Sequence, residues 1–98
     1  MLEELKEYLN ITYDDPVTDR VLQGALERGK AVLSDYAGAE LDYEEGLPRQ
    51  LLFDYCRYVR SHAAEMFEAN FRHDLISLRE RTEVQRIADQ NKRSVPDL

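Results

Sequence analysis

Apolar residues recur at the spacing of an α-helix along most of this chain of 98 residues. The first stripe joins Leu2, Leu5 and Leu9 at positions i, i+3 and i+7. Two glutamates precede Leu5, where the positive end of a helix dipole favours negative charge. These positions predict a short helix over residues 2–10, which a polar break follows.

The second stripe has the clearest start. Asp15 can cap a helix, and Pro16 can occupy its first position, where the missing N–H costs nothing. The small or apolar positions that follow share one helix face: Val21, Leu22, Ala25, Leu26, Gly29, Val32, Leu33 and Tyr36. On that face Gly29 would allow a close helix crossing. Gly38 suits a left-handed C-terminal cap, so the helix is predicted over 16–37.

A third helix, opened by Pro48, is predicted over 48–71. Its apolar arc consists of Leu51, Leu52, Tyr55, Cys56, Val59, Ala63, Met66, Phe67 and Phe71. An arc this wide should contact two elements, or one element and another subunit. The acidic loop over 38–47 is long enough for an antiparallel hairpin. In that hairpin Leu26 and Leu33 are expected to face Leu52, Val59 or Met66.

The remainder of the chain is poorer in apolar residues. Ser77 and Glu80 have the spacing of a capping box, which predicts a fourth helix over about 78–91. Such a helix has little to bury and is marginal alone, so we expect another surface to complete it.

Together these elements predict an all-α fold, in which the short first helix crosses two long antiparallel helices. Residues 1–75 would form the helical core. Residues 76–98 would form a C-terminal helix or tail whose order depends on assembly. Deletion of residues 75–98 is therefore expected to leave the core nearly as stable.

The charges divide the chain unequally. It has 20 acidic and 13 basic residues and a net charge of −7, which argues against a simple cationic DNA binder or a polybasic membrane anchor. Residues 1–45 carry a net charge of −8, whereas residues 46–98 carry +1. This polarity would suit head-to-tail contacts between copies, although an ordinary solvated acidic face explains it too. In the second half acids interleave with the arginines, which favours an ion-paired surface over a phosphate-binding stripe.

The sequence has no pattern typical of a catalytic or metal site. A phosphate-binding glycine loop, paired cysteines and an HExxH motif are all missing. Cys56 and His62 would lie about 240° apart on one helix and could not easily share a metal. Cys56 is more simply a small buried hydrophobe, and a single cysteine makes a reducing compartment the default. The acidic N-terminus is unlike a signal peptide, and no apolar run is long enough to span a bilayer.

Residues 1–75 resemble the small head–tail connector proteins of tailed bacteriophages and prophages. The order of elements carries the resemblance: Leu9 and Ile11 end the short helix, Asp14 and Asp15 form an acidic turn, and a long helix stops at Tyr36 and Gly38. The segment that begins at Pro48 and ends in MFEANFR is similar to the second long helix of the family.

The resemblance implies a structural role without catalysis, metal or cofactor. The chain would form a ring of subunits beneath the portal protein during head completion, and this ring would extend the DNA channel and join the head to the tail. Its partners would be itself, the portal protein and the next neck or tail-completion protein, and DNA would pass through without sequence-specific binding. The chain would be made in the bacterial cytoplasm and located in the virion neck, with no membrane partner.

The candidate contacts with a neighbouring subunit or the portal are Gly24, Phe53, Arg57, Arg60, Leu75, Ile76, Leu78, Val84 and Ile87. Gly24 would point away from the apolar face, so it either allows close approach of a neighbouring chain or is a tolerated surface glycine. The alternative function is a small acidic helical regulator that binds one other protein and has no catalytic activity.

Overall fold

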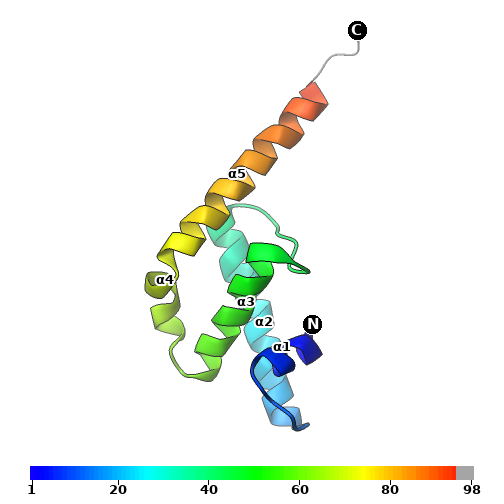
Figure 1. The fold of residues 1–98 in the computed structure, drawn as a ribbon, viewed down its shortest axis with the longest axis vertical. Coiled ribbons are helices and arrows are strands. Elements are labelled where there is room, and N and C mark those ends of the chain that lie inside the picture. The colour runs from blue at the N-terminus through cyan, green and yellow to red at the C-terminus, as the bar shows by residue number, and fades with distance from the viewer. Residues whose placement is uncertain (95–98) are drawn as a thin grey trace.

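The computed structural model describes residues 1–94, with side chains through residue 91, and these residues build an all-α protein without a strand. The elements are α1 (Leu2–Tyr8), α2 (Pro16–Ala37), α3 (Gly46–Arg60), a 3₁₀ turn η1 (Ala64–Met66), α4 (Phe67–Asn70) and α5 (Arg72–Ser94). Figure 1 shows α2 and α3 side by side and antiparallel, α1 beside them, and α5 leading away from the body. The all-α prediction is confirmed.

The limits of α2 follow from residues at its two ends. The Asp15 carboxylate accepts hydrogen bonds from the backbone N–H groups of Val17 and Thr18, and from the Thr18 hydroxyl at 2.7 Å. These bonds hold the pKa of Asp15 below its usual value, the hydroxyl contributing most. At the other end Gly38 adopts a φ of 77° and closes the helix. The predicted range 16–37 is confirmed.

The helices α1, α2 and α3 share one kind of C-terminus. Each is followed by a residue with positive φ: Asn10 at 60°, Gly38 at 77° and His62 at 57°. The next backbone N–H then bonds to a carbonyl five residues earlier, as in the bonds Ile11 to Lys6, Ala39 to Ser34 and Ala63 to Tyr58, at 2.8–3.2 Å. These bonds satisfy carbonyls that the helix end leaves without partners.

The predicted helix over 48–71 is wrong in its second part, because the chain reverses at His62. α3 ends at Arg60, and η1 and α4 carry the chain back alongside α3 toward α5 (Figure 1). No glycine or proline marks the reversal, but histidine is one of the few other residues enriched at positive φ. The fourth helix likewise begins at Arg72, so Ser77 lies inside it and does not cap it.

An aromatic cluster accounts for the reversal. The ring of Phe67 lies edge-on to Tyr55 and Tyr58, at centroid distances of 5.3 and 5.8 Å, and stacks on Phe71 at 4.8 Å. In a straight helix Tyr58 and Phe67 would lie about 14 Å apart along the axis, so they could not touch. The reversal therefore buries Phe67, which an extended third helix would place beyond these rings.

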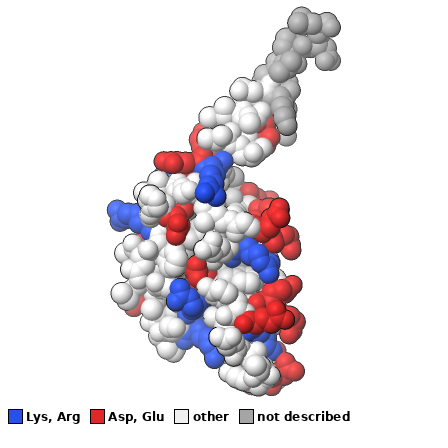
Figure 2. Space-filling view, viewed as in Figure 1, with Lys and Arg blue, Asp and Glu red and all other residues white. Residues whose placement is uncertain are grey.

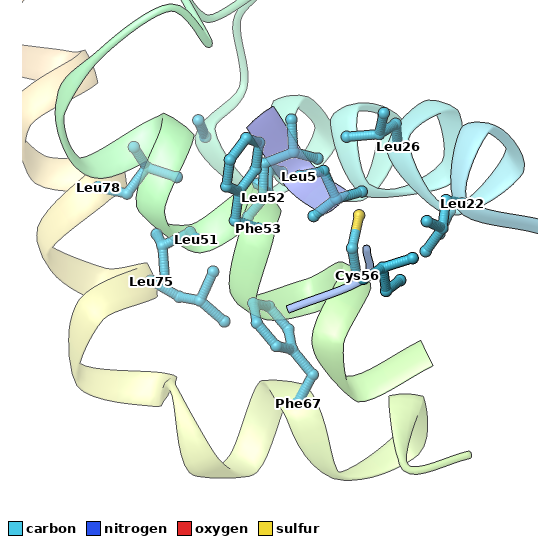
Figure 3. Packing of buried hydrophobic residues seen from close by; sticks show 14 residues of the cluster. Leu5, Leu22, Leu26, Leu51, Leu52, Phe53, Cys56, Phe67, Leu75 and Leu78 are labelled. Atoms are coloured by element: carbon cyan, nitrogen blue, oxygen red, sulfur yellow. The ribbon is translucent and has the colours of Figure 1, made fainter. Parts of the chain in front are cut away.

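The core lies between α2 and α3, and α1 and the first part of α5 complete it (Figure 3). Leu26, Leu33 and Leu52 share this core as predicted, with Val59 packed partly against it. Met66 is 53% exposed, so its predicted core position is wrong. Val21 and Val32 are also exposed, at the edges of the α2 stripe, so that face is narrower than predicted.

α5 makes the molecule elongated. The principal extents are 60 × 27 × 17 Å, and the radius of gyration is 16.1 Å against about 13 Å for a compact chain of this length. The first turns of α5 pack on the body through Leu75 and Leu78. Residues 83–91 are all exposed, so this part of the helix projects beyond the body.

Candidate interaction surfaces

Three of the predicted contact residues lie inside the fold. Phe53 is 6% exposed, and Leu75 and Leu78 are each 2% exposed. In Figure 3 Leu75 and Leu78 lie close to Leu51 of α3. Their assignment to a contact surface is corrected: they attach α5 to the body. α5 is also unbroken at the predicted division after residue 75, so the core includes its first turns.

The remaining apolar candidates on α5 are exposed. Ile76, Val84 and Ile87 have exposed fractions of 44%, 67% and 45%. At about 100° per residue they lie on the side of the helix opposite Leu75 and Leu78. α5 therefore packs one apolar face on the core, and on its other side it exposes three apolar side chains that alternate with Glu80 and Glu83.

Gly24 lies in the middle of α2, and a Cβ added there would meet no atom within 4 Å. The backbone of α2 is regular at this position. Both interpretations of Gly24 fit this open surface: a neighbouring chain could approach closely there, or the helix could merely tolerate a glycine at an uncrowded position.

Arg57 belongs to a hydrogen-bonded network between α1 and α3. The hydroxyl of Tyr8 donates to the buried carboxylate of Asp54, and an Arg57 nitrogen lies 3.5 Å from the same oxygen, Oδ1. The bond to the carboxylate, followed by partial burial, raises the pKa of Tyr8. The guanidinium of Arg57 also lies over the Tyr58 ring, 5.1 Å from its centroid. These contacts place exposed Arg57 and half-exposed Tyr8 on one surface.

Arg60 extends this surface by one turn of α3. It donates to the Tyr13 hydroxyl at 3.4 Å, and the guanidinium lowers the pKa of that phenol. A shallow groove of about 240 Å³ adjoins, and its lining includes both Arg57 and Met66. We define the arginine–tyrosine surface as Tyr8, Tyr13, Arg57, Arg60 and Met66. The tyrosines and Met66 could not be found from the periodicity of α3. Tyr8 and Tyr13 come from α1 and the loop after it, and Met66 lies beside Arg57 only because the chain reverses at His62.

An acidic loop joins α2 to α3 and lies at the opposite end of α3 from Arg60. Its exposed carboxylates belong to Glu40, Asp42, Glu44 and Glu45. A groove of about 430 Å³ separates this loop from α5, and Leu41, Leu47, Pro48 and Leu78 contribute its apolar part. The α5 side is lined by Arg81, Thr82, Gln85, Arg86 and Asp89. The core-facing stripe of α5 thus becomes polar beyond Leu78, where the helix leaves the body.

Charge is unevenly distributed over the molecule. In Figure 2 acidic side chains gather along the right-hand edge of the face shown, whereas basic side chains are spread over the rest of that face, some of them beside the acidic edge.

Lys6 links α1 to the start of α2. Its ammonium lies 2.9 Å from Asp14 Oδ1 and 3.1 Å from Asp19 Oδ1, although the Lys6 side chain is only 4% exposed. Hydrogen bonds to Asp14 and then Asp19 raise the pKa of Lys6 well above its usual value. The buried ammonium is compensated by a hydrogen bond to Asp14 and an ion pair with Asp19, so Lys6 has a structural role.

Among residues 1–91, the side chains with catalytic or metal-binding chemistry do not converge on one site. Cys56 is buried, and burial raises the pKa of its thiol to about 12, so the reactive thiolate is scarce at neutral pH. Within the described residues no three His, Cys, Asp or Glu side chains are grouped to hold a metal ion. Among these residues, too, no helix has the length and apolar character that crossing a membrane requires.

Comparisons of the chain with protein-family models, curated proteins and solved structures find no match. The candidate function therefore rests on these surfaces and on the resemblance seen in the sequence.

Proposed function

We propose that this chain is a structural head–tail connector of a tailed bacteriophage or prophage. In this role it forms a ring beneath the portal, extends the DNA channel, and offers a platform to the next neck protein. The chain acts by contact alone and uses no catalytic group, metal or cofactor. It is made in the bacterial cytoplasm and ends in the virion neck.

The observation that carries the proposal is the division of the molecule into a packed body and a projecting helix. Beyond Leu78, α5 leaves the body with Val84 and Ile87 exposed. A helix that uses one face for attachment and exposes apolar side chains on its other side is suited to contact a second surface. A connector has this task, because it must contact neighbouring subunits and the portal together.

The first elements of the structure match the order on which the resemblance is based: a short helix, an acidic turn that caps a long helix, and an antiparallel partner helix. That partner helix ends at Arg60, however, and does not continue to the segment MFEANFR. The acidic surface also suits a channel, since it would repel the DNA backbone and let the duplex slide.

The test uses the phage or prophage genome that encodes the chain. The double variant Val84→Asp/Ile87→Asp should leave the free subunit folded, because both side chains are exposed. It should reduce the joining of tails to DNA-filled heads at least about tenfold, since charge replaces apolar contact. Electron microscopy and plaque counts would measure this loss.

The matched control is Val17→Asp/Val32→Asp, which introduces the same charges at two exposed valines of α2. It should leave joining near the wild-type level. Virions that assemble normally without the chain would overturn the proposal. Recovery of the chain with a single non-structural protein, and not with heads, would instead support the regulator alternative.

A further inference from the structure

We infer that the arginine–tyrosine surface of one copy docks against the acidic loop and adjoining groove of a second copy, in a head-to-tail contact. The inference deepens the proposed function and rests on it for its biological setting. It names the partner, a second copy of this chain, and the two different surfaces that meet.

The first argument is the placement of the two surfaces. α3 has 15 residues and is about 22 Å long, with the acidic loop before its first turn and Arg57 and Arg60 in its last. A helix dipole favours charges of these signs at its ends, but it requires no exposed tyrosine or methionine there. Opposite charges at opposite ends allow one copy to bind the next in the same orientation.

The second argument is the amino-acid composition of the arginine–tyrosine surface. Tyrosine, methionine and arginine are enriched in protein interfaces, and all three occur on the arginine–tyrosine surface. Tyr8, Tyr13 and Met66 are 46%, 51% and 53% exposed, so all three side chains are accessible to a partner. Hydrogen bonds to Asp54 and Arg60 already orient the two tyrosines, so docking would cost them little additional order.

The third argument is that the acidic loop and its groove complement the arginine–tyrosine surface. Its groove has leucine and proline walls that can accept an apolar or aromatic side chain. Glu40 and Asp42 line the loop side of the groove, whereas Arg81 and Arg86 lie on its α5 side, so the acidic charge is concentrated on the loop. No described ion pair engages Glu40, Glu44 or Glu45 within the chain. Nucleic acid is a poorer partner for the arginine–tyrosine surface, because Asp54 lies within it and the chain carries a net charge of −7.

Sedimentation velocity of the purified chain tests the inference over a range of concentrations and salt. We expect association at low salt that weakens as salt rises. Arg60→Glu and the double variant Glu40→Lys/Glu44→Lys should each weaken association at least about tenfold, through like-charge contacts. The second variant is decisive because it lowers the net negative charge. If the copies were kept apart only by their net charge, this variant would associate more strongly than wild type. Docking between the two surfaces instead predicts that it associates more weakly.

Combining the three substitutions in one chain should restore part of the association, because Arg60→Glu then places a carboxylate opposite the ammonium groups introduced by Glu40→Lys and Glu44→Lys. Arg20→Glu and Glu27→Lys, at exposed positions of α2, are matched controls that should change little. Thermal unfolding of each variant shows that it folds. A wild-type chain that stays monomeric at low salt would overturn the inference, and so would reversals without effect or a triple variant without rescue. If such a chain still joins heads to tails, the proposed function survives, whereas an associating chain absent from heads would contradict only that function.

Discussion

Gly29 marks a close approach between α2 and α3. A Cβ at this position would lie 2.6 Å from Leu52 Cδ1 and 2.9 Å from Tyr55 Cδ1. Leu52 is fully buried, so its methyl group has little room to move. The close crossing expected from the sequence is thus confirmed, and the glycine serves packing instead of flexibility.

Replacement of this glycine should separate packing from helix propensity. Gly29→Ala should destabilise the fold by about 1–3 kcal/mol, because overpacking outweighs the gain in propensity. Gly24→Ala is the matched control in the same helix, and it should stabilise by about 0.5–1 kcal/mol, since its Cβ meets nothing. Urea unfolding of both variants gives the free energies, and equal effects would show that crowding at Gly29 is unimportant.

Deprotonation of Lys6 should lower the free energy of unfolding at alkaline pH. Its pKa is raised in the folded protein, so its contribution is complete below the unfolded value of about 10.4 and is lost as the pH rises toward the folded value. Lys6→Met removes this contribution at every pH. The difference in unfolding free energy between wild type and variant should therefore stay constant up to about pH 10 and then shrink. A difference that stays constant to pH 12 would contradict this role.

At the scale of elements, the turn after α3 determines the architecture. His62 is exposed and has a φ of 57°, a conformation that costs a non-glycine residue about 1–2 kcal/mol. His62→Gly should therefore stabilise the protein by about 1 kcal/mol, with the glycine's greater unfolded entropy reducing the gain. His62→Val should destabilise it, because a β-branched residue is poorly tolerated there. Thermal unfolding measures the stability of both variants. A valine variant as stable as wild type would show that residue 62 does not adopt a positive φ.

The same turn shows what could be predicted from the sequence. Asp15, Pro16 and Gly38 are local signals, so α2 was predicted to the residue. The end of α3 carries no such signal. Its residue with positive φ is a histidine, and the contact that stabilises the turn is a tertiary one, between Phe67 and Tyr58. The positions of Leu75 and Leu78 depend on the same turn. Without the reversal, the segment after α3 would run away from α2 and could not bury these two leucines.

The candidate surfaces were predicted only in part, for the same reason. Arg57 and Arg60 could be found from the sequence because they follow the periodicity of one helix. Their companions Tyr8 and Tyr13 come from α1 and the loop after it. Only the three-dimensional arrangement of α1 against α3 brings these residues together, and no spacing within one element encodes it.

At the scale of the whole molecule, the boundary between body and projecting helix lies within α5. Leu75 and Leu78 are each 2% exposed, and the Thr82 hydroxyl bonds back to the Leu78 carbonyl at 2.8 Å. Beyond this turn every described side chain of α5 is exposed. Deletion of residues 75–98 would remove these two core leucines, so the structure argues against the expectation that it costs little stability.

Two variants should locate this boundary. A chain that ends at Thr82 keeps the buried leucines, so its unfolding free energy should stay within about 1 kcal/mol of wild type, since fraying of one exposed helix costs little. Leu75→Ala should instead cost about 2–5 kcal/mol, the usual range for a leucine in a filled core. Denaturant unfolding measures both, and hydrogen exchange of a monomeric sample should show amide protection in α5 that falls beyond Thr82. A truncated chain as unstable as the leucine variant would mean that the projecting part is held by contacts with the body, and α5 would then belong to the core along its length.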